Sequence, residues 1–223
     1  MKANTTNTEI ITITPIEIKK TKIRIVGDTP LIAHAWSEKA RRMMLDAQQG
    51  KKAVAKKELR DPFADFIAAA YWMTNKPDYM RGLEDFYKAV EGGARFGFPV
   101  TAIKQAAQSA AYRLGWVKNQ MALRGSFFIE AENDGLAEVH AKSIVMREDM
   151  VRVGMGTSDL RYRPQYDGWY MDLVLSYNAS GSIPLDGIIN AINAGGYCVG
   201  IGEWRPEKDG DFGRFHVEAS PEA

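Results

Sequence analysis

The sequence predicts an α+β fold in which an antiparallel sheet is covered by helices on one face. Three observations support this prediction. The chain contains two amphipathic helical segments, each lies between strand-like segments, and the hydrophobic period changes to two after residue 126. The first strand is expected over 22–26, where Ile23 and Ile25 alternate with polar residues before a turn at Gly27 to Pro30.

The clearest helix is expected over 101–114. Ile103, Ala106, Ala110 and Leu114 recur at spacings of three and four, and Gly115 is placed to end the helix. Residues 31–97, between the first strand and this helix, are expected to form a basic helical insertion. Within it we expect helices over 37–49 and 63–73, with 76–95 irregular.

The second half of the chain is predicted to contain several strands and one further helix. Asn133-Asp134-Gly135 predicts a hairpin turn joining strands 126–130 and 136–140 within the region 126–146. A second insertion, 152–167, is expected to form a thumb-like β-hairpin before a strand over 169–177. Helix 184–194 follows, closed by Gly195 and Gly196, and a last strand is expected over 212–217.

This β-α-β-β-α-β order is that of a modified ferredoxin-like, or RRM-like, fold. The chain, 1–223, is expected to form a single domain of this kind with the two insertions. No fixed-period repeat is evident, and the length of 223 residues suits one large domain.

The stretch from Gly195 to Phe215 is unusually rich in glycine. Glycine permits positive φ and close approach of a backbone to a ligand, and arginine offers a planar fork that suits phosphate. The candidate polyanion-binding residues in this stretch are Gly200, Gly202, Gly210, Gly213, Trp204, Arg205, Lys208 and Arg214.

A second segment, Arg152 to Tyr166, interleaves arginine with aromatic residues. Arginine can meet phosphate while flat rings stack on bases, so both segments favour binding of single-stranded nucleic acid. The alternative is that these aromatic residues pack internally and that the arginines pair with acids such as Asp159, Glu203 and Glu207. The further candidates for nucleic-acid contact are His34, Trp36, Arg41, Arg42, Lys104, Arg152, Arg161, Tyr162 and Arg163.

Signals for an enzyme are few. The three histidines are scattered, Cys198 is the only cysteine, and no metal-binding or nucleotide-binding motif is present, so we expect no cofactor, no metal and a non-catalytic protein. Asp28, in the turn after the first strand, is the one candidate for phosphate cleavage. No long apolar run or signal peptide is evident, which predicts a soluble cytoplasmic protein.

The order of elements and the terminal glycines resemble the repeat-associated mysterious protein (RAMP) superfamily, the RNA-recognition-like backbone subunits of CRISPR effector complexes. Gly200-Ile-Gly202-Glu-Trp-Arg205 and Gly210-Asp-Phe-Gly213-Arg-Phe215 are similar to that family's Gly-x-Gly-Arg and Gly-x-Gly-x-Phe loop, with extra residues in each half. Phe98 to Lys104 is similar to its proline-led helix start, although Gln105 replaces the usual glycine. The resemblance implies binding of single-stranded RNA along a helical row of identical subunits.

The leading expectation is therefore a self-associating, single-strand-coating protein, either CRISPR-backbone-like or a stand-alone phage-encoded relative in a bacterial host cell. Whether it binds RNA or DNA stays open, because individual contacts read the 2′-hydroxyl. Two alternatives remain. One is a metal-dependent ribonuclease that uses Asp28, as some backbone subunits of this superfamily do, and the other is a viral structural or assembly protein.

Overall fold

The structure is a computed structural model that describes residues 15–36, 38–50, 59–133, 135–154 and 156–218. Its central sheet has four antiparallel strands in the order β4-β8-β1-β9. These strands are β1 (Ile18–Gly27), β4 (Phe127–Ile129), β8 (Tyr170–Asn178) and β9 (Phe215–Glu218). The α+β class and an antiparallel sheet are thus confirmed.

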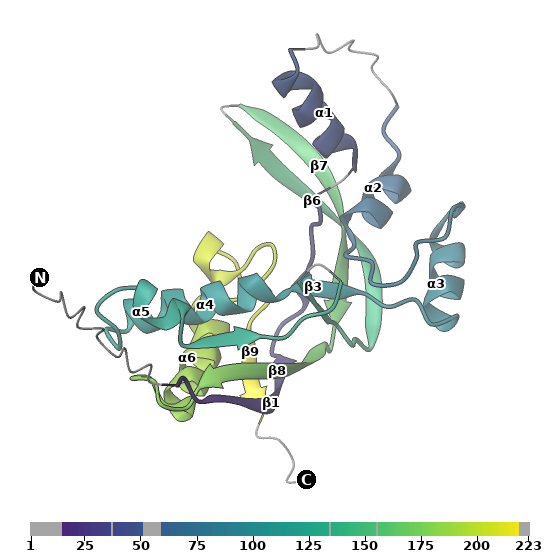
Figure 1. Cartoon of the computed structure of the whole chain (residues 1–223). Coiled ribbons are helices and arrows are strands. Elements are labelled where there is room, and N and C mark those ends of the chain that lie inside the picture. The colour runs from purple at the N-terminus through teal and green to yellow at the C-terminus, as the bar shows by residue number, and fades with distance from the viewer. Residues whose placement is uncertain (1–14, 37, 51–58, 134, 155, 219–223) are drawn as a thin grey trace, which may run out of the picture.

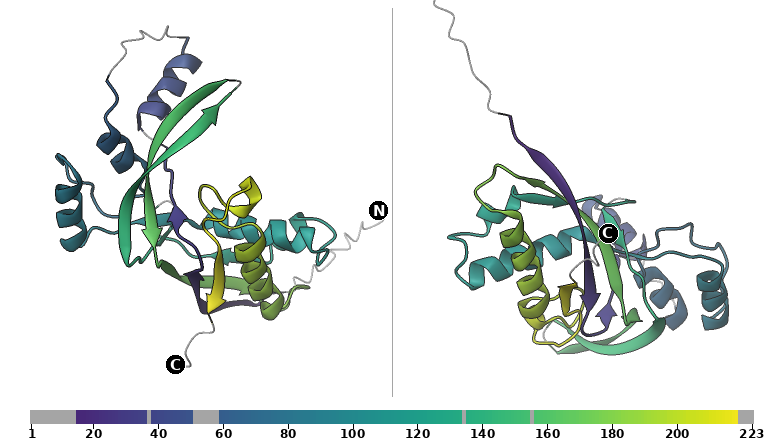
Figure 2. Two further views of the ribbon diagram at one scale, coloured as in Figure 1. Left: turned by 180° about the vertical axis from the view of Figure 1, so that it is seen from behind. Right: turned by 90° about the horizontal axis from the view of Figure 1, so that it is seen from below.

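Two long helices, α4 (Val100–Arg113) and α6 (Leu185–Cys198), lie side by side on one face of this sheet (Figure 2). Alternate residues of the strands point into the layer between sheet and helices, among them the buried Ile23, Ile25, Leu173 and Leu175. The period-two pattern therefore marks the sheet face that the helices cover.

A second sheet consists of a long hairpin and one short strand. It contains β6 (Ser143–Val153), β7 (Thr157–Asp167) and β2 (Leu31–Ile32) in the order β2-β7-β6. The hairpin projects from the four-stranded sheet (Figure 1) and is longer than the predicted insertion 152–167, because its first strand begins at Ser143. Gly154 and Gly156 adopt positive φ near its tip.

The predicted turn around Asn133 to Gly135 is closed by an antiparallel bridge between Glu132 and Leu136, but the predicted pairing of its two flanking strands is wrong. Its first strand, β4, pairs with β8, whereas β5 (Leu136–Glu138) pairs with β3 (Gly97–Pro99) in a separate two-stranded sheet. The Asn-Asp-Gly sequence determines only the local turn. Which strands pair depends on which side chains are buried together. Phe127 and Ala137 are buried, and they contribute to the core through these different partners.

The described residues of the region 31–97 form three helices, α1 (Glu38–Gln48), α2 (Pro62–Ala69) and α3 (Leu83–Glu91). Asp61 caps α2 by accepting hydrogen bonds from the Phe63 and Ala64 amides. The expectation that 76–95 is irregular is wrong, because α3 forms there. Its Phe86 is buried edge-to-face against Phe66, with ring centroids 4.9 Å apart.

The expectation that Gly195 and Gly196 end the second helix is also wrong, since α6 continues to Cys198. A Cβ at Gly195 would lie 2.7 Å from the backbone of Ala106 and Ala107. At Gly196 it would lie 2.0 Å from the Phe215 carbonyl oxygen. These glycines therefore let α6 pack closely on α4 and β9. Among the described residues, no helix has the length and apolarity needed to cross a membrane.

Candidate functional site

The loop from Val199 to Arg214, here called the glycine loop, connects α6 to β9 and includes the 3₁₀ turn η1 (Pro206–Lys208). Gly200, Gly202 and Gly213 adopt positive φ. The Glu203 amide donates to the Ile32 carbonyl at 2.9 Å, and the Gly213 amide donates to the Pro30 carbonyl at 2.8 Å. The loop is thereby fastened to the segment that follows β1.

The glycines of this loop serve its internal packing. A Cβ at Gly202 would lie 2.5 Å from the Ile32 carbonyl oxygen, and one at Gly210 would lie 1.9 Å from that of Trp204. Trp204 itself has φ of 53° and accepts a hydrogen bond from the Phe212 amide at its carbonyl. The sequence suggested that these glycines let the backbone approach a ligand closely. In the structure they let backbone segments of the protein approach one another.

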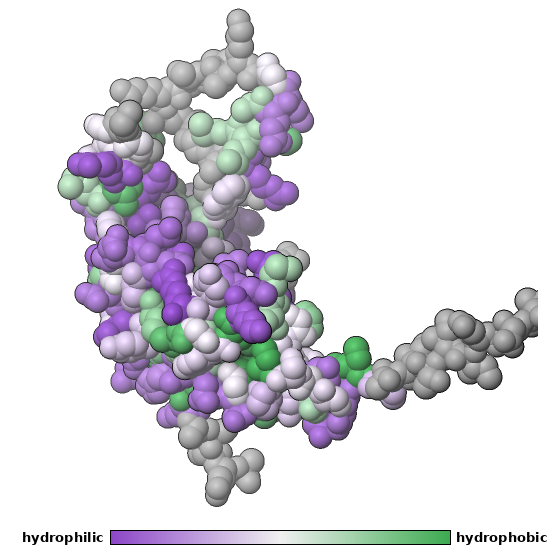
Figure 3. Space-filling view, turned by 90° about the vertical axis from the view of Figure 1, so that its left-hand side faces the viewer, coloured by the Kyte–Doolittle hydropathy of each residue, from purple (hydrophilic) through white to green (hydrophobic). Residues whose placement is uncertain are grey.

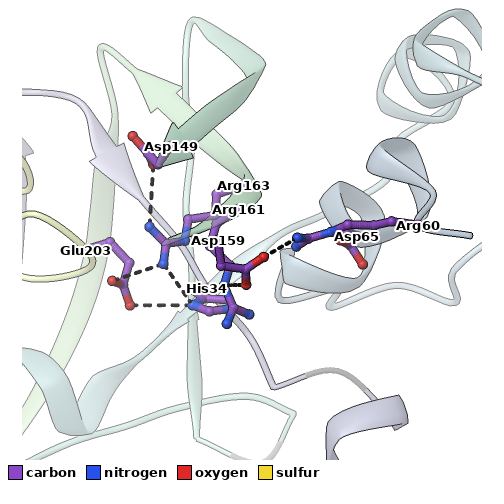
Figure 4. Close-up of polar contacts among 8 residues, drawn as sticks. All are labelled: His34, Arg60, Asp65, Asp149, Asp159, Arg161, Arg163 and Glu203. Atoms are coloured by element: carbon purple, nitrogen blue, oxygen red, sulfur yellow. Dashed lines mark hydrogen bonds and ion pairs between the residues drawn. The ribbon is translucent and has the colours of Figure 1, made fainter. Parts of the chain in front are cut away.

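A set of charges, buried at Arg163 and Asp149 and partly exposed at His34 and Glu203, joins the hairpin to the glycine loop (Figure 4). Arg163 on β7 is only 4% exposed. Its guanidinium lies 3.4 Å from Asp149 on β6, 3.5 Å from Glu203 and 3.4 Å from His34 Nδ1. We call His34, Asp149, Arg163 and Glu203 the Arg163 network.

The electrostatics of the Arg163 network favour ionised Glu203. His34 Nδ1 lies 3.7 Å from its carboxylate, and this contact, together with Arg163, lowers the pKa of Glu203 although partial burial opposes the shift. Arg147 extends the network, because it donates to Asp149 at 2.7 Å and lies over the Phe212 ring at 4.5 Å. The base of the hairpin is thus held against the loop from two positions.

A second group of charges, the Arg60 cluster, joins the hairpin to α2. Arg60 donates to Asp65 at 2.6 Å and also bonds Asp159 on β7, which pairs with Arg161 at 2.9 Å. The Arg60 guanidinium lies 5.8 Å from the centroid of the Tyr162 ring. Figure 4 shows this cluster on the other side of His34 from Glu203. The two groups of charges brace the hairpin from opposite sides.

Three of the arginines predicted to contact nucleic acid are therefore engaged inside the protein. Arg163 is buried, so we assign it to bracing and not to a binding surface. Arg161 pairs with Asp159, and Arg205 donates to Glu207 and to the Gly202 carbonyl. The alternative of internal pairing with Asp159, Glu203 and Glu207 is confirmed at these three positions. Arg214 is half-buried, and its Nε has no hydrogen-bond partner among the described residues.

Lys104 lies apart from the other candidates. Its ammonium group is 4.1 Å from the centroid of Phe128 on β4, and burial lowers the pKa of the amine. Lys104 extends from α4 toward β4, the edge strand of the four-stranded sheet. The glycine loop lies beside other residues of this helix. The structure therefore does not bring Lys104 together with His34 and Trp204.

The remaining candidates are exposed. Arg41 and Arg42 on α1 and Arg152 near the tip of β6 have no ion pair with a described residue, and Trp36 is 73% exposed. Because α1 and the outer half of the hairpin extend to one end of the molecule (Figure 1), we call these four residues the arginine end. Lys208 is also exposed, on the glycine loop. Figure 3 shows the face on the left-hand side of Figure 1, where hydrophilic residues cover much of the surface and hydrophobic residues form separate patches. The basic residues of 51–58 lie outside the described residues.

Sequence reasoning missed two sets of residues. Asp149 and Arg147 occupy a strand whose hydrophobic alternation is weak, and only the burial of Asp149 in the structure shows that it faces inward. A polar cavity between α4 and the glycine loop was also missed. Among the residues that line it are His34, Gln105, Gln108, Gln120, Arg124, Glu203 and Glu207.

Asp28, the candidate for cleavage chemistry, lies at the end of β1. Its carboxylate is 2.6 Å from His216 Nδ1, and both side chains are partly exposed. Within the described ranges, no group of three His, Cys, Asp or Glu side chains is placed to hold a metal ion.

Comparison with known proteins gives no further information about this site. No protein-family model matches the chain, and no curated protein shows significant similarity to it.

Proposed function

We propose that this chain is a non-catalytic, single-stranded nucleic-acid-binding protein that self-associates along the strand. The observation that carries the proposal is the arginine end, where exposed arginines that have no ion pair with a described residue and an exposed tryptophan accompany a projecting hairpin. Free cations give a salt-sensitive affinity for phosphates, and an exposed indole can stack on a base.

The fold that we propose for this role is ferredoxin-like. The order β1, α4, β4, β8, α6, β9 along the chain supports it, together with the antiparallel sheet order β4-β8-β1-β9 and two helices on one face. The hairpin would then be an insertion between the second and third strands of that core. Its bracing by the buried Arg163–Asp149 pair and the partly exposed Arg60–Asp159 pair supports a role for it as a rigid thumb that reaches beyond the subunit.

Fluorescence anisotropy with labelled single-stranded RNA, single-stranded DNA and duplex, with light scattering on the same samples, tests the proposal. We expect single strands to bind more tightly than duplex, and the scattering mass to grow as strand is added. Ordered assembly that is indifferent to nucleic acid would instead identify an assembly protein. Absence of binding to any of these ligands at low salt would overturn the proposal.

A further inference from the structure

The cavity between α4 and the glycine loop has a volume of about 460 Å³. This volume falls within the range of small-molecule sites in proteins, roughly 300–1,000 Å³. Its walls come from separate parts of the chain: the segment carrying His34, Tyr71, the end of β3 with one side of α4, the residues around α5 (Met121–Arg124), and Val199 to Glu207 of the glycine loop. Because secondary structure and backbone hydrogen bonds hold these parts, the cavity is a formed feature of the fold.

Gln108 is the residue that distinguishes this cavity from a surface hollow. It is 7% exposed, and its side-chain amide has no hydrogen-bond partner among the described residues. The polar atoms of the amide are not fully enclosed, so the amide is open to the cavity that Gln108 lines. The amide carries both a donor and an acceptor, and Gln105 and Gln120 also line the cavity. A ligand with a complementary edge would satisfy Gln108.

The charges of the walls decide which class of ligand fits. Glu203 and Glu207 both line the cavity, and the Arg205 guanidinium is already held by Glu207 and the Gly202 carbonyl. Both carboxylates are already compensated within the protein, Glu203 by Arg163 and Glu207 by Arg205 and Arg113, so neither is left to pair with a charged ligand. Arg124, which has no ion pair with a described residue, is the remaining lining cation. The walls therefore favour a neutral planar group that offers a donor beside an acceptor.

We infer that this cavity takes one base of the bound single strand, with the Gln108 amide hydrogen-bonded to the edge of the base. This inference rests on the proposed function. Glutamine pairs with bases through two parallel hydrogen bonds, as it does with adenine in DNA grooves. A base turned out of the strand would enter the cavity while its phosphates stay outside, away from Glu203 and Glu207. The site would thus read a base without contributing to the phosphate-dependent affinity.

The test compares two strands and two variants. One oligonucleotide carries natural bases, and the other has the same length and phosphates but only abasic units. Gln108→Met keeps the length of the side chain and removes its hydrogen bonds. We expect it to weaken binding of the natural strand by about 2- to 10-fold, the worth of a lost hydrogen bond, and to leave binding of the abasic strand unchanged. Arg41→Gln with Arg42→Gln is the matched control, and it should weaken binding of both strands equally.

The outcomes separate this inference from the proposed function. If the wild type binds neither strand at low salt, the proposed function fails. If the wild type binds but Gln108→Met weakens neither strand, or weakens both equally, the base-binding inference alone is overturned. The thermal unfolding temperature of Gln108→Met should be close to that of the wild type, because the Gln108 amide makes no hydrogen bond with a described residue. Should this variant fail to fold, Gln108→Leu provides the same comparison.

Discussion

The guanidinium of Arg163, on the hairpin, lies 3.5 Å from the carboxylate of Glu203, on the glycine loop. These residues are far apart in the sequence, and their contact couples the projecting hairpin to the loop that closes the fold. Since Arg163 is also 3.4 Å from Asp149, one buried cation is shared by two strands and one loop. The position of the hairpin thus depends on this network.

Replacing Arg163 with methionine should destabilise the protein strongly. The change removes one of the two described cations that compensate the buried Asp149 carboxylate and leaves only Arg147, and a buried charge with weakened compensation is costly. We expect a loss of about 3 kcal/mol in the free energy of unfolding, measured by urea titration. The control, Arg161→Met, removes a more exposed ion pair and should cost less than about 1 kcal/mol. Equal losses in the two variants would contradict the bracing role of Arg163.

The lowered pKa of Glu203 predicts a pH dependence of stability. The folded carboxylate binds fewer protons than the unfolded one, so its contribution is complete above the ordinary glutamate range and is lost as pH falls through the lowered pKa. The stability difference between wild type and Glu203→Gln should therefore shrink as pH decreases from 7 to 3. Urea titrations of both proteins at several pH values measure it. A difference that stays constant with pH would refute the assignment.

Alanine substitutions at Gly213 and Gly115 distinguish the cost of a left-handed backbone from the cost of a steric clash. Gly213 and Gly115 have φ of +65° and +74°, but a Cβ at Gly213 would lie 1.7 Å from the Ile201 carbonyl oxygen, and one at Gly115 would meet no atom within 4 Å. Gly115→Ala should cost about 1 kcal/mol from left-handed strain alone. Gly213→Ala should cost at least about 2 kcal/mol more, because the backbone must move. Thermal unfolding of the two variants checks this, and similar losses would mean that the loop adapts freely.

Lys104 should not contribute to nucleic-acid binding. Its ammonium group is directed to Phe128 at the sheet edge, away from the arginine end. Lys104→Met should therefore leave both the affinity for single strands and its salt dependence unchanged, as read by anisotropy across a salt series. A reduced salt dependence would instead place a phosphate contact at this edge of the sheet.

Local patterns in the sequence predicted the central elements well. The alternation of Ile23 and Ile25 and the small apolar face of α4 mark the core directly, because burial on one face sets these periods. The partners of β4 and β5 were not predictable from Asn133 to Gly135, since a turn signal carries no information about distant strands. α3 was missed because a single buried aromatic residue, Phe86, anchors it.

The candidate site was harder to predict than the fold. An arginine on a strand looks the same in sequence whether it faces solvent, like Arg152, or the interior, like Arg163. The difference depends on acids supplied by β6 and the glycine loop, which only the three-dimensional arrangement brings close. Gln108 was missed for the same reason, since its burial depends on the cavity walls contributed by distant segments.

The central claim, that the exposed arginines of the arginine end hold the phosphates of a single strand, is tested most directly by a salt series. Affinity for a single-stranded oligonucleotide would be measured for wild type and for the combined variant Arg41→Gln, Arg42→Gln and Arg152→Gln. The log of the binding constant should fall with the log of salt, and the slope should flatten by about 0.7 for each phosphate contact removed. Since these side chains are exposed, folding stability should change little. An unchanged slope, or no binding by the wild type at low salt, would contradict the claim.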